Sequence, residues 1–191
     1  MPRDLFVTRA LRAWLLRLWL ACVLGLGLLP AQAETPEISS FELVHNDEGV
    51  SLSFAVRFEL PRGVEDALQK GLPLFFVAEA DIFRERWYWL DRRINTTSRT
   101  WRVAYQPLTR SYRVTFGGLN QNFQSLTDAM ASVRRISAWK LAEPGQMEDG
   151  ARHYVAFRYR LDVTQLPRPM QIGIGGQPDW ALSVQRTQKI N

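Results

Sequence analysis

The sequence predicts a mainly β protein, an antiparallel immunoglobulin-like β-sandwich with two short helices. Three observations support this fold class. Apolar and polar residues alternate along several short runs, turn-forming residues separate these runs, and strands do not alternate regularly with long helices. An α+β protein with an antiparallel sheet is the alternative. We expect seven or eight strands in a single domain.

Residues 1–33 have the pattern of a secretory signal peptide. Four arginines precede an apolar run from Leu18 to Leu29, and Ala31-Gln32-Ala33 then supplies an A-x-A cleavage site. The run has 12 residues, whereas a membrane span needs about 20. We therefore expect cleavage rather than a permanent anchor. The mature chain, residues 34–191, is expected to be one exported β-sandwich domain.

Cys22 is the only cysteine, and it lies inside this apolar run. The residues before it fit a lipidation signal poorly, so the mature chain is expected to have no thiol, no disulfide and no cysteine-based metal site. The mature part holds 20 basic and 18 acidic side chains, so most of the net positive charge of the whole chain lies in the leader. This near balance, together with export, argues against a nucleic-acid partner.

A hairpin and a short helix are the first elements expected in the mature chain. Residues 38–60 contain two β-rich runs joined by the turn at residues 46–49. In the second run, apolar residues alternate with polar or small ones from Leu52 to Phe58, which predicts one buried face. Apolar residues at helical spacing follow from Val64 to Leu68, and Gly71 then predicts a glycine C-cap.

The segment from Leu74 to Leu90 is too long for one ordinary strand at about 3.3 Å per residue. We expect it to begin as a central strand that is apolar on both faces. It should bend or break near Ala78–Asp81. Beyond that point the pattern predicts Trp87 and Trp89 on one face and arginines on the other.

A second hairpin is predicted by the alternation in residues 101–105 and 112–116. The spacing of Ser125 and Asp128 is that of a capping box, so the second helix is expected to begin there.

Residues 152–163 alternate almost without error and predict a strand with one apolar face. The two prolines in Leu166–Pro169 are expected to exclude both a helix and a central strand. A last strand is expected at residues 180–185.

The segment from residue 84 to residue 93 is the candidate binding surface. Its arginines suit carboxylate or phosphate groups, and its tryptophans suit stacking on a ligand. The alternative is that the tryptophans belong to the core and the arginines pair with Glu79, Asp81 and Glu85. The candidate residues are Arg84, Arg86, Trp87, Trp89, Arg92 and Arg93.

No catalytic residue, metal site or cofactor is expected. His45 and His153 are the only histidines and lack the characteristic spacing of a histidine-rich zinc site, and neither a phosphate loop nor a dinucleotide fingerprint is present. The acidic residues Glu79, Asp81 and Glu85 are the best group for a glycan-cleaving enzyme. Cross-strand salt bridges explain them at least as well, so the sequence does not favour an enzyme.

Four stretches together resemble an exported proteobacterial family described as domain of unknown function 4390. They are LPRGVEDALQKGLPLFFVAEADIFRERWYWLDRR, RTWRVAYQPLTRSYRV, the Gly-Gly-Leu of residues 117–119, and LDVTQLPRP. The resemblance covers nearly all of the mature chain and implies an envelope protein. Because genes of relatives often lie near that of a nitrogen-regulation-type membrane sensor kinase, it suggests such a kinase or another envelope protein as a partner. The family has no established activity, so no catalytic residue is carried over.

The expected function is therefore that of a periplasmic binding or interaction module, accessory to an envelope sensor kinase, whose ligand the sequence does not identify. One alternative is an enzyme acting on envelope glycans, which requires two carboxyl groups within about 5 to 10 Å of each other. The other alternative is a carrier of lipid or lipopolysaccharide, which requires a sizeable apolar cavity between the sheets.

Overall fold

The computed structural model describes residues 35–148, 150–166, 168–174 and 176–190. The predicted signal peptide, including Cys22, lies outside the described residues. The chain divides into two compact units, Met1–Ala33 and Glu34–Asn191, and every element discussed below belongs to the second. None of the helices in the described ranges is long and apolar enough to cross a bilayer.

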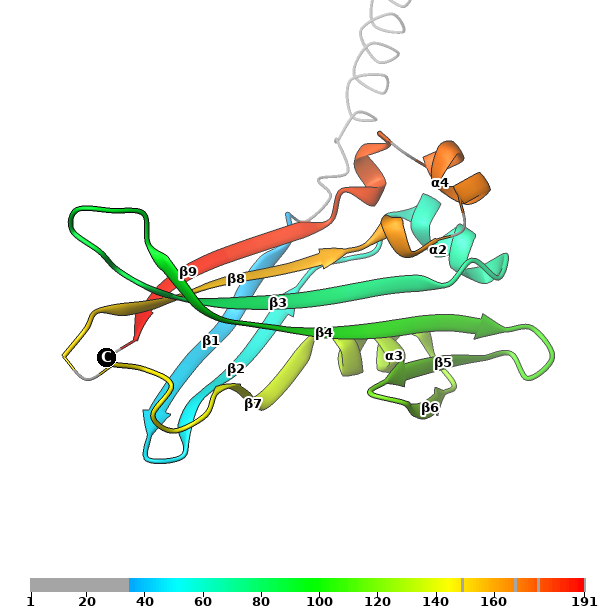
Figure 1. Cartoon of the computed structure of the whole chain (residues 1–191). Helices are drawn as coiled ribbons and strands as arrows, with labels where there is room; N and C mark the ends of the chain where they lie inside the picture. Colours follow the sequence, from blue (N-terminus) through cyan, green and yellow to red (C-terminus); the bar gives the residue numbers. More distant parts are fainter. Residues whose placement is uncertain (1–34, 149, 167, 175, 191) are drawn as a thin grey trace, which may run out of the picture. The chain divides into compact units, whose positions relative to one another are not determined.

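Two antiparallel sheets, one of three strands and one of six, make up most of the described chain (Figure 1). The strands are β1 (Glu37–Asn46), β2 (Gly49–Arg57), β3 (Leu74–Arg84), β4 (Arg92–Gln106), β5 (Ser111–Phe116), β6 (Leu119–Phe123), β7 (Arg135–Ala142), β8 (His153–Leu161) and β9 (Ser183–Ile190). The smaller sheet has the order β1-β2-β7, and the larger has β6-β5-β4-β3-β8-β9. The predicted mainly β, antiparallel architecture is confirmed. Immunoglobulin-like topology is not, since immunoglobulin constant domains have sheets of four and three strands.

Short helices lie in the connections between strands. They are α2 (Arg62–Gln69), α3 (Leu126–Val133) and α4 (Arg168–Ile174), with single 3₁₀ turns at η1 (Val163–Gln165) and η2 (Pro178–Trp180). The predicted cap of α3 is present, because the amide of Asp128 donates to Ser125 Oγ at 3.1 Å. The prediction that Leu166–Pro169 excludes a helix is wrong. Pro169 lies in the first turn of α4, where its missing N–H removes no intrahelical hydrogen bond.

Aromatic side chains fill the space between the two sheets. The ring of Phe54 on β2 lies 4.6 Å from that of Phe157 on β8 and 6.1 Å from that of Tyr159. Tyr159 is 0 % exposed, and its phenol donates to the carbonyl oxygen of Val133 at 3.0 Å. A buried hydroxyl needs such a partner, so this bond lets a tyrosine occupy the centre of the core. Figure 1 shows β1 and β2 crossing the strands of the larger sheet obliquely.

The β3–β4 pair differs from the prediction. β3 runs unbroken from Leu74 to Arg84, so the break expected near Ala78–Asp81 is wrong. Ala78 and Ala80 are fully buried, and Ala78–Asp81 pair without interruption with both β4 and β8, so the strand continues through this segment. The chain leaves the sheet at Glu85–Asp91 instead, and β4 begins at Arg92, well before the predicted start. Figure 1 shows this connection projecting beyond the ends of the strands.

Strands β6 and β7 were not predicted, and β9 begins later than the last strand predicted from the sequence. Four of the five side chains of β6 are exposed, so this strand lacks the alternation that predicts one. β7 follows α3 directly and is recognised by its pairing with β2, where Leu52 lies opposite Trp139. β9 begins at Ser183 because the preceding residues 178–180 form η2.

Candidate functional site

The connection between β3 and β4 exposes four consecutive large apolar side chains. Trp87 is 90 % exposed, Tyr88 70 %, Trp89 71 % and Leu90 83 %. Elsewhere in the described ranges, exposed large hydrophobic residues are isolated in the sequence. We call residues 84–93 the aromatic–arginine loop. The exposures exclude the alternative that its two tryptophans belong to the core.

Asp91 fixes the base of the aromatic–arginine loop. Its Oδ1 atom accepts from the backbone amide of Arg86 at 3.1 Å, and its Oδ2 atom accepts from the phenol of Tyr154 at 2.9 Å. The ring of Tyr154 on β8 stacks on Phe83 of β3, with 5.2 Å between centroids. Burial, the hydrogen bond to Asp91 and the charges of Asp91 and Glu85 raise the pKa of Tyr154 to about 12. The phenol therefore stays protonated and keeps its role as donor at physiological pH.

Ion pairs connect the base of the loop to neighbouring elements. The Glu85 carboxylate lies 3.5 Å from Arg152 Nε and 3.5 Å from Lys189 Nζ of β9. Arg84 pairs with Glu148 of the β7–β8 connection at 2.5 Å. An open depression of about 780 Å³ lies between the loop and the β7–β8 connection. It is lined by Arg84–Tyr88, Asp91 and Gly150–Arg152. These contacts hold the base of the loop against the sheet while its tip extends into solvent.

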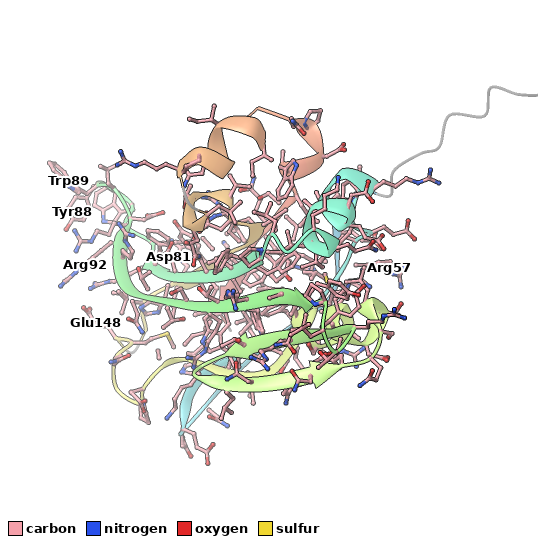
Figure 2. The ribbon with its side chains drawn as sticks, turned by 90° about the vertical axis from the view of Figure 1, so that its right-hand side faces the viewer. Arg57, Asp81, Tyr88, Trp89, Arg92 and Glu148 are labelled. Atoms are coloured by element: carbon pink, nitrogen blue, oxygen red, sulfur yellow. The ribbon has the colours of Figure 1, made fainter. Side chains whose placement is uncertain are left out.

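The loop arginines differ in their partners. Arg93 Nη1 lies 3.7 Å from Asp81 Oδ1. Within the described ranges, no carboxylate oxygen lies within 4.0 Å of Arg86 or Arg92. The predicted pairing of these arginines with Glu79, Asp81 and Glu85 therefore holds for Arg93 alone. Figure 2 shows Tyr88, Trp89 and Arg92 together at one end of the domain and Arg57 at the other.

The acidic residues considered for catalysis are engaged by protein donors. Glu79 Oε2 accepts from Arg160 Nη1 at 2.5 Å, and Asp81 Oδ1 accepts from Thr96 Oγ1 at 2.5 Å. Both carboxylates line a shallow depression of about 430 Å³ on the outer face of the larger sheet, whereas Glu85 lines the depression beside the loop. The structure thus places Glu79 and Asp81 in one depression, where Glu79 forms a salt bridge with Arg160 and Asp81 one with Arg93, and leaves Glu85 apart.

The two histidines, His45 and His153, line the same depression of about 400 Å³. His153 is 5 % exposed, and its Nε2 atom has no hydrogen-bond partner within the described residues. His45 reaches the depression from the β1–β2 turn. No sequence motif signals this meeting, because it depends on the packing of the two sheets. The described ranges contain no group of three or more side chains arranged to hold a metal ion.

Replacing Tyr154 by phenylalanine is expected to loosen the loop without unfolding the domain. The variant keeps the ring that stacks on Phe83 but loses the donor to Asp91, which costs about 1 kcal/mol. Hydrogen exchange at the Arg86 amide should accelerate about fivefold. Because the pKa of Tyr154 is raised above its ordinary value, the stabilising bond is present below pH 10 and is lost only above about pH 12. The acceleration should therefore be the same at about pH 6 and pH 9.

A matched control for this prediction is Tyr112→Phe, at a partly buried tyrosine of β5 far from the loop in sequence. It should leave exchange at Arg86 unchanged. Unaltered exchange in Tyr154→Phe would show that Asp91 holds the loop without the phenol.

These features define a mainly β, two-sheet domain that presents an exposed aromatic–arginine loop at one end. The chain belongs to the family described as Domain of unknown function (DUF4390), whose model matches residues 33–190. The resemblance found in the sequence is thereby confirmed. No curated protein and no solved structure matches the chain.

Proposed function

We propose that the protein is a periplasmic binding module that engages other envelope components through the aromatic–arginine loop. One observation carries this proposal: Trp87, Tyr88, Trp89 and Leu90 are 70–90 % exposed and contiguous. Isolated exposed apolar residues are common, but contiguous ones mark interaction sites. Tryptophan, tyrosine and arginine are also the residues that supply most binding energy at protein interfaces.

The cellular setting of this proposal rests on the leader and on the family. A signal peptide at residues 1–33 would deliver the domain to the periplasm. Genes of relatives in this family often lie near that of a membrane-bound sensor kinase. We therefore propose that such a kinase or another envelope protein is the partner. The domain would then act as an accessory component rather than as an enzyme.

The two alternative functions have less support. A lipid carrier needs an apolar cavity between the sheets, and Phe54, Phe157 and Tyr159 occupy that space. A glycan-cleaving enzyme needs two carboxyl groups presented to its substrate. Glu79 and Asp81 are instead engaged by Arg160 and Thr96.

Crosslinking and pull-down from envelope fractions test the proposed function. The intact protein should recover a defined set of envelope components, and a Trp87→Ser/Trp89→Ser variant should recover at least about tenfold less of them. Neither side chain contributes to the core, so thermal denaturation should show the same Tm for both proteins. Leu108→Ser is the matched control, because Leu108 is 101 % exposed in the β4–β5 turn, outside the loop. Equal recovery by the intact protein and the double variant would overturn the proposal.

A further inference from the structure

We infer that the aromatic–arginine loop docks on the surface of a phospholipid bilayer that contains anionic lipids. This inference rests on the proposed function, because it names the envelope component that the same loop contacts; a membrane-bound protein partner would then meet the domain at the membrane surface. The domain would rest on the membrane through the tip of the β3–β4 connection, which would place it beside membrane-bound proteins of the envelope.

The shape of the site favours a bilayer over a folded protein partner. The exposed apolar side chains form one run of four residues on a projecting loop (Figures 1 and 2). Other exposed large hydrophobic residues in the described ranges belong to different elements, such as Leu108 in the β4–β5 turn and Ile172 in α4. A stable protein interface buries about 800 Å² on each partner, which requires a broader surface. The projecting tip of the loop can insert between the lipids of a bilayer surface, which is fluid and needs no complementary pocket.

The chemistry of the tip matches the interfacial region of a bilayer. Tryptophan and tyrosine combine an apolar ring with a polar N–H or O–H group, so they concentrate at the boundary between acyl chains and headgroups. Trp87, Tyr88 and Trp89 supply such rings, and Leu90 supplies a purely apolar side chain beside them. The polar atoms of the rings would stay at the headgroup level while the apolar parts are buried.

The charges around the tip favour anionic headgroups. Within the described residues Arg86 and Arg92 have no carboxylate partner, so both guanidinium groups remain available to phosphate oxygens. The two acidic residues of the connection are both engaged at its base. Glu85 lies against Arg152 and Lys189, and Asp91 is held by two hydrogen bonds from neutral donors, the Arg86 amide and the Tyr154 phenol. With Arg86 and Arg92 against Asp91, the loop keeps a net positive charge.

The hydrogen bonds at the base of the loop support docking by reducing its entropic cost. Asp91 joins the Arg86 amide to Tyr154, so the two ends of the tip are held together before any ligand binds. A preorganised loop loses less conformational freedom on binding. Because membrane attachment generally requires both an apolar and an electrostatic contribution, the structure predicts reversible binding that weakens with salt.

Co-sedimentation with lipid vesicles tests this inference. The protein should be purified from the periplasmic fraction and its N-terminus sequenced, since an uncleaved leader would itself bind lipid. Vesicles of phosphatidylcholine with about 30 % phosphatidylglycerol should bind the intact protein at low salt at least about tenfold more tightly than pure phosphatidylcholine vesicles. About 0.5 M salt should remove most of this difference.

Two loop variants and two controls make the test specific. Trp87→Ser/Trp89→Ser and Arg86→Glu/Arg92→Glu should each reduce binding to the anionic vesicles at least about tenfold. Leu108→Ser and Arg57→Glu change an exposed apolar and an exposed basic residue away from the loop, so both should bind like the intact protein. Circular dichroism should show the same fold for all five proteins.

The outcomes separate this inference from the proposed function. If the intact protein does not bind anionic vesicles, or if both loop variants bind as well as it does, the membrane inference is overturned. If the pull-down nevertheless recovers envelope proteins only when Trp87 and Trp89 are present, the loop is a protein-binding site and the proposed function stands. Failure of both experiments would overturn both proposals.

Discussion

Replacing Tyr159 by alanine is expected to destabilise the domain by about 3–5 kcal/mol. This is a large part of the roughly 5–15 kcal/mol by which a typical domain is stable. Tyr159 is fully buried between the sheets, with its ring 6.1 Å from that of Phe54 and 6.0 Å from that of Phe76. Removing it leaves a cavity lined by large aromatic side chains, which cannot close it without moving a strand. Urea denaturation followed by circular dichroism measures the loss.

Tyr159→Phe is the matched control for this prediction. It keeps the ring and removes the hydroxyl that donates to the Val133 carbonyl, so the expected loss is about 1–2 kcal/mol. Burial raises the pKa of Tyr159 well above its ordinary value, so the tyrosine is neutral in the native protein and the control changes no charge. If alanine and phenylalanine cost the same, the hydroxyl and not the ring would stabilise the core.

Replacing Gly49 by alanine is expected to destabilise the domain by about 3 kcal/mol, through backbone strain and a steric clash. Gly49 has φ of 104°, a conformation that alanine rarely adopts. A Cβ atom there would overlap the carbonyl oxygen of Ala142 and lie 3.0 Å from the carbonyl carbon of Glu143. Both atoms belong to the backbone, so relief requires breaking the contact between β2 and β7, where Val50 lies opposite Ala142.

Gly118→Ala separates these two contributions. Gly118 also has a positive φ, 83°, but a Cβ atom there meets nothing within 4 Å. Its substitution should therefore cost only the strain, about 1 kcal/mol. Urea denaturation of both variants gives the comparison. Equal losses at the two glycines would show that the approach of β2 to β7 tolerates a methyl group.

Both stability predictions concern the sheets, whereas the proposed binding residues lie outside the core. This separation makes the functional experiments interpretable. Trp87 and Trp89 are exposed, and Arg92 is exposed beside them, so substitutions there should change binding with little effect on unfolding. The domain thus has a packed scaffold that holds a loop whose side chains contribute little to stability.

The alternation of apolar residues predicted the buried faces well. In β2 and β8 every second side chain, including Phe54, Phe157 and Tyr159, is buried as the pattern indicates. The pattern is informative because successive side chains of a strand point to opposite faces, and one face of each strand lies on the core. Capping of α3 by Ser125 was predicted for a similar reason, since it involves residues three positions apart.

The missed elements lack such a local signal. The first half of β4 is polar, with Thr96 and Ser98 on the outer face, and becomes a strand by pairing with β3. β6 is exposed for nearly its whole length. The prolines near residue 168 led to the wrong prediction that no helix forms there, because a proline in the first turn is compatible with a helix.

The sequence alone was enough to predict the mainly β class, the antiparallel hairpins, the α3 cap and the family to which the chain belongs, because each of these depends on residues close together or on a pattern along the chain. It also located the aromatic and arginine residues of the candidate site. The exposure of Trp87 and Trp89 and the pairing of Arg84 with Glu148 depend instead on three-dimensional packing. The chain leaves β3 after Arg84 and joins β4 only at Arg92, so the aromatic side chains between them lie outside the paired strands and are exposed to solvent.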